Sequence, residues 1–192
     1  MSLWGAIRRG CFPHQLSWLI DNPMRRMFIS PGALADRLPL HQGSHVLEVG
    51  PGSGYFSREL VRRVRDGRLE LLDVQPEMLL KAIRKFDGSP PANLGWTKGD
   101  ASQALPFAAE SFDIVVLVAV LGELPNPEQA LKSFFRVLRP GGIVAVHEHL
   151  PDPDIIWPKR LRALMAAEGF RFHRQYGIAW NYTALFEKPA LL

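Results

Sequence analysis

Short apolar stretches alternate with segments of helical periodicity along most of the chain. Apolar runs predict seven strands, and apolar residues spaced three or four apart between them predict helices. Strands that alternate with helices indicate parallel βαβ units, with helices on both faces of one sheet. No helix separates the last two strands, so we expect an antiparallel hairpin that turns at Gly177. The expected strands cover residues 45–50, 69–74, 94–99, 112–120, 143–147, 170–175 and 182–187.

Capping residues and prolines mark the helix boundaries. Ser30 and Pro31 supply an N-cap and a first-turn proline. Asn126 and Pro127 repeat this pattern before a helix that we expect to stop at residues 140–142. Another helix opens at Pro76, and its expected inner face carries Met78, Ala82, Ile83 and Phe86.

The first 40 residues differ from the rest, because aromatic residues and prolines punctuate them and no strand pattern emerges. We expect an N-terminal helical arm over residues 1–40 and a single globular domain over residues 41–192. With 192 residues, of which 47% are apolar, the chain can bury a substantial core.

The chain carries a formal charge of +4, and the excess lies in its first third. Residues 1–68 contain ten arginines and five acidic residues. A solvated basic face explains this excess best, with a nucleic acid, a membrane surface or another acidic partner as alternatives. The single cysteine, Cys11, excludes an internal disulfide framework, and no apolar run reaches 18 residues. We expect a cytoplasmic protein, with membrane association or targeting to an organelle as alternatives, because the first 20 residues contain Arg8 and Arg9 and no acidic residue.

A glycine-rich turn follows the first expected strand, over residues 48–54 (EVGPGSG). In open α/β sheets such a turn lies at the carboxyl edge, where ligands bind. The dinucleotide fingerprint fails here, because Ser57 stands where its third glycine should be. Glu48 beside the turn would repel a pyrophosphate and attract a cation, such as an amino-acid ammonium or a sulfonium.

Acidic residues end three successive expected strands. Glu48 lies two residues before Gly50, and Asp73 lies 23 residues after Gly50. Asp100 ends the third expected strand. An acid at the position of Asp73 can grip ribose hydroxyls, and one at Asp100 can accept a hydrogen bond from an adenine amino group. Any one of them alone would be read as a loop acid, but three behind one glycine turn indicate a nucleoside site.

These motifs together resemble the class I S-adenosylmethionine-dependent methyltransferases. The matching segments include VLEVGPGSGYFS (46–57), KGDA (98–101) and LKSFFRVLRPGGIVAVHEHLPDPD (131–154). The RVLRPGG turn is typical of the branch with ubiquinone/menaquinone-biosynthesis methyltransferases. The resemblance implies a Rossmann-like, doubly wound α/β sheet in the order 3-2-1-4-5-7-6, with strand seven antiparallel. It also implies S-adenosylmethionine as cofactor and S-adenosylhomocysteine as product.

The resemblance also implies roles for the residues at matching motif positions. The glycine turn lines the methionine and ribose portions, and Glu48 supports the amino group. Asp73 holds the ribose hydroxyls, and Asp100 reads the adenine edge. The end of the fourth strand faces the sulfonium. The implied cofactor-binding residues are Glu48, Gly50, Pro51, Gly52, Ser53, Gly54, Asp73, Val74, Met78, Asp100, Ala101, Val118 and Ala119.

Substrate-side candidates follow the fourth and fifth strands. Strand alternation should point His147 and His149 to one face and Glu148 to the other. His147, Glu148 or Glu123 could act as a base or orient the acceptor, although polar residues at these positions could equally cap strand or helix ends. A metal site of His147, His149 and Asp152 is less well supported, and we expect no metal.

Missing motifs narrow the acceptor. Residues 118–121 (VAVL) replace the Asn/Asp-Pro-Pro-Tyr/Phe motif of enzymes that methylate adenine or glutamine nitrogens, and no Pro-Cys motif exists. A small apolar or aromatic acceptor is therefore favoured over a nucleic acid. The arm over residues 1–40 is expected to act as a lid, and its aromatic residues could line an acceptor pocket or touch a membrane. A non-catalytic cofactor-binding module and an RNA methyltransferase remain as alternatives.

Overall fold

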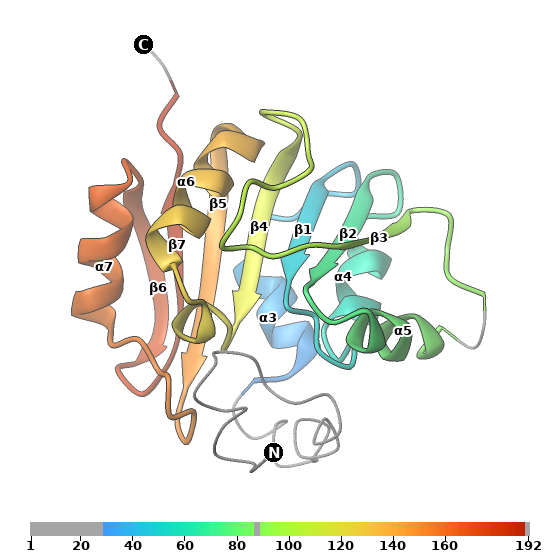
Figure 1. Ribbon diagram of the computed structural model, residues 1–192, viewed down its shortest axis with the longest axis horizontal. Helices are drawn as coiled ribbons and strands as arrows, with labels where there is room; N and C mark the ends of the chain where they lie inside the picture. The colour runs from blue at the N-terminus through green and yellow to red at the C-terminus, as the bar shows by residue number, and fades with distance from the viewer. Residues whose placement is uncertain (1–28, 87–88, 191–192) are drawn as a thin grey trace.

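The computed structural model describes residues 29–86 and 89–190, which form a seven-stranded sheet with helices on both faces (Figure 1). The strand order is β3-β2-β1-β4-β5-β7-β6. Neighbouring strands from β3 to β5 pair in parallel, and β7 runs antiparallel to both β5 and β6. This confirms the predicted order and the terminal hairpin. The strands are β1 His45–Val49, β2 Arg68–Asp73, β3 Leu94–Lys98, β4 Phe112–Val118, β5 Leu138–His149, β6 Arg171–Ile178 and β7 Asn181–Glu187.

Two hydrophobic clusters lie on opposite faces of the sheet. Helices α3, α4 and α5 contribute to one cluster, and α6 and α7 contribute to the other. The helices are α3 Pro31–Arg37, α4 Ser57–Arg63, α5 Pro76–Arg84, α6 Pro127–Val137 and α7 Pro158–Ala167, with a short 3-10 helix η3 at Leu121–Glu123.

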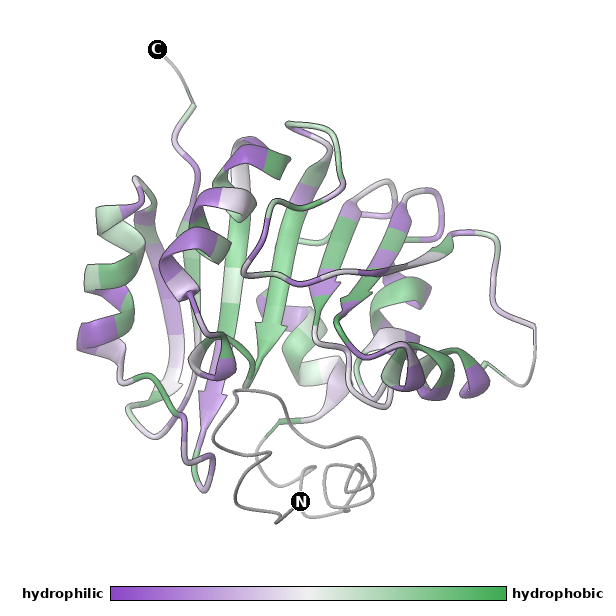
Figure 2. Ribbon diagram, viewed as in Figure 1, coloured by the Kyte–Doolittle hydropathy of each residue, from purple (hydrophilic) through white to green (hydrophobic). Residues whose placement is uncertain are grey.

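The central strand β4 is apolar at successive positions, and the packing on its two faces explains why. Ile114 and Val116 pack in the cluster of α3, α4 and α5, whereas Val115 and Leu117 pack in the cluster of α6 and α7. Because both faces of this strand are covered, it needs apolar side chains at successive positions. Figure 2 shows the resulting hydrophobic band along β4 and β5.

The predicted capping residues start their helices as expected. The Ser30 side chain accepts a hydrogen bond from the Ala33 backbone at 3.2 Å. The Asn126 side chain accepts one from the Gln129 backbone at 3.0 Å. Each bond satisfies a backbone donor that has no partner within the first helical turn.

Replacing Asn126 with alanine is expected to lower the free energy of unfolding by about 1 kcal/mol, because the Gln129 N–H loses its acceptor. Urea denaturation followed by circular dichroism measures the change. Asn126→Ser keeps a capping oxygen and should stay close to the wild type. An alanine variant as stable as the wild type would contradict the role of this cap.

Helix α3 belongs to the packed core. Leu34 and Ala35 are buried in the same cluster as Val46 and Leu60, although they lie within the predicted arm. Residues 1–28 of that arm lie outside the described residues, so the division at residue 40 stays a prediction. Between residues 29 and 190, apart from 87–88, the helices are too short or too polar to cross a bilayer.

Two predicted turns were wrong in position. Helix α6 ends at Val137, and β5 already begins at Leu138, because Leu138 pairs with Phe112 of β4. Gly141 and Gly142 lie within β5 and exchange 2.8 Å backbone hydrogen bonds with Lys188 beyond β7. Gly177, with φ at +85°, lies within β6, and the hairpin turns at residues 179–180 instead.

The inner face of α5 also differs from the prediction. Met78 and Ala82 are buried as expected, and Leu79 is buried with them. Ile83 and Phe86 are only half-buried. Phe86 lies beyond the last helical residue, Arg84, so the helical spacing used for the prediction no longer applies to it.

Candidate active site

The predicted site residues follow the carboxyl ends of the parallel strands, which lie at the lower edge of the sheet in Figure 1. Backbone hydrogen bonds extend the strand pairing into the loops. Gly50 donates to Leu72 at 2.8 Å, and Gly99 donates to Asp73 at 3.0 Å. These bonds hold the starts of the first and third loops beside the end of β2.

The glycine turn is left-handed at Gly50, Gly52 and Gly54, with φ at +63°, +57° and +79°. A Cβ on Gly50 would lie 2.6 Å from the Val120 side chain, and one on Gly54 would lie 2.8 Å from the Ala82 backbone. Packing therefore leaves no room for side chains at these two positions. Gly52 differs, because a Cβ there would meet only the Met78 methyl at 3.9 Å. Its backbone faces open space that a ligand could enter.

Residues 51 and 53 fix the turn from inside. Pro51 is buried, and Ser53 is 2% exposed. Lys85, just after α5, donates from Nζ to Ser53 Oγ at 3.1 Å. Sequence reasoning missed Lys85, because a contact across 32 residues leaves no spacing signal.

Glu48 is buried at the end of β1, with 3% of its surface exposed. The Ser57 hydroxyl, at the start of α4, donates to Glu48 Oε2 at 2.6 Å. Ser57 therefore positions this carboxylate, whereas the sequence identified Ser57 only as a departure from the dinucleotide fingerprint. A buried carboxylate beside an open glycine backbone favours a cationic ligand.

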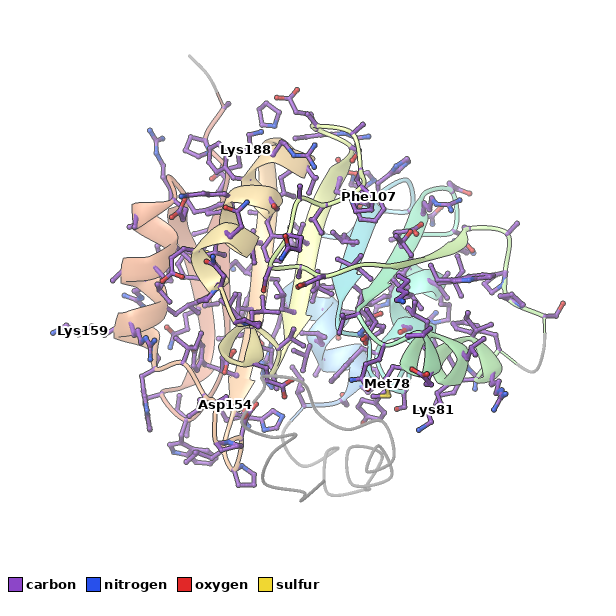
Figure 3. All side chains as sticks on the ribbon, viewed as in Figure 1. Met78, Lys81, Phe107, Asp154, Lys159 and Lys188 are labelled. Carbon is purple, nitrogen blue, oxygen red and sulfur yellow. The ribbon has the colours of Figure 1, made fainter. Side chains whose placement is uncertain are left out.

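Asp73 ends β2 and is largely withdrawn from water. Burial raises the pKa of its carboxyl to about 6, although hydrogen bonds from the Gln75 and Val74 backbones act in the opposite direction. The Gln75 N–H lies 2.9 Å from Asp73 Oδ1. Val74 is exposed and Met78 is buried, and Figure 3 shows Met78 on α5 near the lower edge of the sheet.

The third and fourth loops complete this side. The Asp100 carboxylate accepts a hydrogen bond from the Ser102 backbone at 2.8 Å, and Ala101 is buried. Val118 ends β4, and Ala119 adopts a φ of +54°. A left-handed alanine is strained, and such strain is concentrated at functional sites.

His147 lies on the face of the sheet that α3 covers. It pairs in register with Val118, and its carbonyl accepts a hydrogen bond from the Ala119 N–H at 2.8 Å. The ring Nδ1 lies 3.0 Å from Thr183 Oγ1, which in turn accepts a 2.8 Å hydrogen bond from Arg37 on α3. Arg37 and Thr183 were missed, because they lie 146 residues apart in the sequence.

Glu148 points to the opposite face, as strand alternation predicted, and the rings of His147 and His149 lie 5.6 Å apart on their shared face. The Ile156 N–H donates to Glu148 Oε2 at 3.1 Å, and the Tyr182 hydroxyl donates to the Ile156 carbonyl. Glu148 and Tyr182 therefore hold the Ile156 backbone and with it the loop after β5. Among the described residues, Glu148 Oε1 has no hydrogen-bond partner.

Burial raises the pKa of Glu148 to about 8, and the carboxylates of Asp152, Glu123 and Asp154 add to the shift. Glu123 comes close to Glu148 because η3, which carries Glu123, packs against the loop after β5. A Cβ on Gly122 would lie 1.9 Å from the Asp154 carbonyl oxygen. Within residues 29–86 and 89–190, no three histidine, cysteine or acidic side chains are grouped so that they could hold a metal ion.

The residues at this edge fit S-adenosylmethionine. Its sulfonium and ammonium are cations, and Glu48 places a buried carboxyl group at the end of β1, directly before the turn. Its ribose offers two hydroxyls, for which Asp73 carries a desolvated carboxyl. The open backbone at Gly52 would admit the ligand, and Met78 offers an apolar surface beside it.

Comparisons with known proteins agree with this geometry. The family described as Methyltransferase domain matches residues 47–146, more than half of the chain. The ubiquinone/menaquinone biosynthesis C-methyltransferase UbiE of Roseobacter denitrificans is 36% identical over 124 residues, which cover 63% of this chain and 49% of that protein. This chain thus spans about half the length of the UbiE relatives that it matches.

Two further comparisons extend the match beyond that segment. The 2-phytyl-1,4-naphtoquinone methyltransferase of Thermosynechococcus vestitus is 35% identical over 185 residues, covering 93% of this chain and 78% of that protein. The crystal structure of a SAM dependent methyltransferase from Aquifex aeolicus shares the fold, with a TM-score of 0.81, 22% identity and coverage of 92% of this chain and 97% of that one. The chain therefore belongs to the methyltransferase domain family, within the UbiE-like branch of the class I S-adenosylmethionine-dependent group.

Proposed function

We propose that this protein transfers the methyl group of S-adenosylmethionine to a small apolar acceptor of the quinone type. The observation that carries the acceptor class is the match to the 2-phytyl-1,4-naphtoquinone methyltransferase, because it covers 93% of this chain and 78% of that relative. The UbiE matches support the same class over a shorter segment.

The cofactor supplies a methyl group that is already activated by the sulfonium charge, so the protein mainly has to bind, orient and exclude water. In this proposal Glu48 binds the cationic end and Asp73 accepts hydrogen bonds from the ribose hydroxyls. Asp100 and Ala101 contact the adenine, with Val74 and Met78 at its border. Val118 and Ala119 face the reacting end.

The acceptor would enter from the side of β4 and β5. A ring carbon that gains a methyl group must lose a proton, and His147 is our candidate to take it or to orient the acceptor, since its backbone pairs with Val118 at the end of β4. The His147 ring is fully buried, so in this proposal the side chains that cover it move when the acceptor binds. Glu123 is a second candidate for acceptor contact. Glu148 holds the Ile156 backbone, so we propose that it acts as a positioning residue for the loop after β5.

Transfer of a labelled methyl group tests this function. The full-length protein is incubated with methyl-labelled S-adenosylmethionine and either 2-phytyl-1,4-naphthoquinol, the same quinol already methylated at its free ring carbon, or total RNA. We expect label only in the first acceptor. Label in RNA, or no transfer to the quinol by protein that binds the cofactor, would overturn the proposal.

Deleting residues 1–28 is expected to leave a folded protein that binds S-adenosylmethionine and methylates the acceptor poorly. The members of the two core clusters among the described residues lie between residues 29 and 186, and the deletion removes none of them. Thermal melts, cofactor titration and the transfer assay separate these effects. Full acceptor methylation by the shortened protein would contradict the proposal that this segment acts as a lid.

Membrane contact by residues 1–40 and a cytoplasmic location stay predictions.

A further inference from the structure

Four large apolar side chains are exposed at one end of the sheet. Trp157 is 50% exposed, Trp180 46%, Ile178 55% and Leu150 39%. Exposed apolar residues are ordinary when scattered, but a group of them marks an interaction surface. We call these four residues the tryptophan rim.

Hydrogen bonds tie the three segments of the rim together. Leu150 donates its backbone N–H to the Trp180 carbonyl at 2.9 Å. Ile178 pairs with Asn181 across the hairpin turn that carries Trp180. Trp157 follows Ile156, whose backbone is held by Glu148 of β5 and Tyr182 of β7. The four residues therefore lie on neighbouring segments at one end of the sheet, namely the loop after β5, the hairpin of β6 and β7, and the residue that precedes α7.

The rim borders the candidate active site. Leu150 directly follows β5, and His147 is two residues before the end of that strand. Figure 1 shows the loop after β5 at the same lower edge as the ends of β1 and β4, and Figure 3 shows Asp154 of that loop at this edge. A ligand held at the rim would lie close to the acceptor side of the site.

The chemistry of the rim fits a lipid surface. Tryptophan has an apolar body and a polar N–H, and it concentrates where hydrocarbon meets water. Lys159 and Arg160 are exposed in the first turn of α7, directly after Trp157 in the sequence, and Figure 3 shows Lys159 pointing outward. Asp152 and Asp154 balance their charge. The apolar side chains protrude at loop and hairpin ends, which suits insertion into a bilayer better than a flat protein interface.

We propose that the tryptophan rim inserts into the surface of a phospholipid bilayer, so that an apolar acceptor reaches the site from the membrane. The second clause rests on the proposed function, whereas the membrane contact itself does not. Because the nearby charges balance, binding should depend on the apolar side chains and should change little with salt or with the fraction of anionic lipid.

Quenching by brominated phosphatidylcholine vesicles tests the proposal, with Trp96 as matched control. Trp96 is 47% exposed, but it lies on β3, at the opposite edge of the sheet. In a full-length background with Trp4→Phe and Trp18→Phe, one variant adds Trp96→Phe, leaving only the rim tryptophans. The other adds Trp157→Phe and Trp180→Phe, leaving only Trp96. We expect strong quenching of the rim tryptophans and little quenching of Trp96.

A second measurement uses vesicle sedimentation. Trp157→Ser with Trp180→Ser should lower partitioning onto phosphatidylcholine vesicles at least about fivefold, whereas Trp96→Ser should leave it unchanged. Equal quenching of Trp96 and the rim, no vesicle binding, or a rim variant that changes only the oligomeric state would each overturn the proposal. The last outcome would assign the rim to a second copy of the chain.

Failure of the rim and failure of the proposed function are distinguishable. S-adenosylmethionine binding and methylation of a quinol without its long side chain, added in aqueous solution, should be unchanged in both serine variants. Vesicle binding without any quinol methylation would leave the rim intact and reject the function. Quinol methylation without vesicle binding would support the proposed function and reject the membrane contact of the rim.

Discussion

Replacing Asp73 with alanine is expected to weaken S-adenosylmethionine binding between about 10- and 100-fold while the protein stays folded. In our account this carboxylate accepts the ribose hydroxyls, and a hydrogen bond to a charged acceptor contributes about 1.5–3 kcal/mol. Burial already raises the pKa of Asp73 to about 6, so removing the carboxyl should not destabilise the fold through lost charge. Calorimetric titration measures the affinity, and a thermal melt checks folding.

Glu77→Ala is the matched control, because this exposed acid lies four residues from Asp73 in the first turn of α5. Its affinity should equal that of the wild type. The wild-type affinity should also fall as the pH drops through about 6, since the protonated carboxyl of Asp73 is a poorer acceptor. Unchanged affinity in Asp73→Ala would refute the ribose role.

Between pH 5 and pH 8 the wild type is expected to lose about 2–4 kcal/mol of unfolding free energy that the Glu148→Gln variant does not lose. Burial raises the pKa of Glu148 to about 8 in the folded protein, whereas the unfolded chain has the ordinary value of 4.5. The folded state therefore keeps a proton that the unfolded state loses. The stabilisation is complete below pH 4.5 and declines as the pH rises toward 8. Glutamine stays neutral and removes this decline.

Urea unfolding at several pH values measures the difference between variant and wild type. We expect Glu148→Gln to gain stability relative to the wild type as the pH rises. Its amide oxygen can still accept from the Ile156 N–H. Glu128→Gln replaces an exposed glutamate in the first turn of α6, and its curve should parallel the wild type. Parallel curves for Glu148→Gln would contradict a buried, neutral carboxyl.

Local features of the fold were predictable from the sequence. The apolar pattern predicted seven strands, and Ser30 and Asn126 marked helix starts correctly, because capping is decided within three residues. The strand order followed from family motifs and not from periodicity. The turn at Gly177 was wrong, since β6 continues past this glycine and register with β7 sets the turn at residues 179–180.

The candidate site shows the same division. Glu48, Asp73 and Asp100 could be placed because each lies at or just beyond the carboxyl end of a strand of a parallel sheet. The groups that support them could not, because Ser57 reaches Glu48 and Lys85 reaches Ser53 only after the helices have packed. Likewise, Tyr182 and Glu148 can both hydrogen-bond to the Ile156 backbone only because β7 lies beside β5. Contacts of this kind follow from tertiary packing and leave no periodic signal.

Calorimetric titration of the full-length protein with S-adenosylmethionine, S-adenosylhomocysteine and NAD tests the central claim most directly. The buried Glu48 and the carboxyl of Asp73 predict binding of the first two ligands with micromolar dissociation constants and no binding of NAD. Binding of NAD, or failure of folded protein to bind either S-adenosyl ligand, would contradict the assignment of this edge of the sheet as the cofactor site.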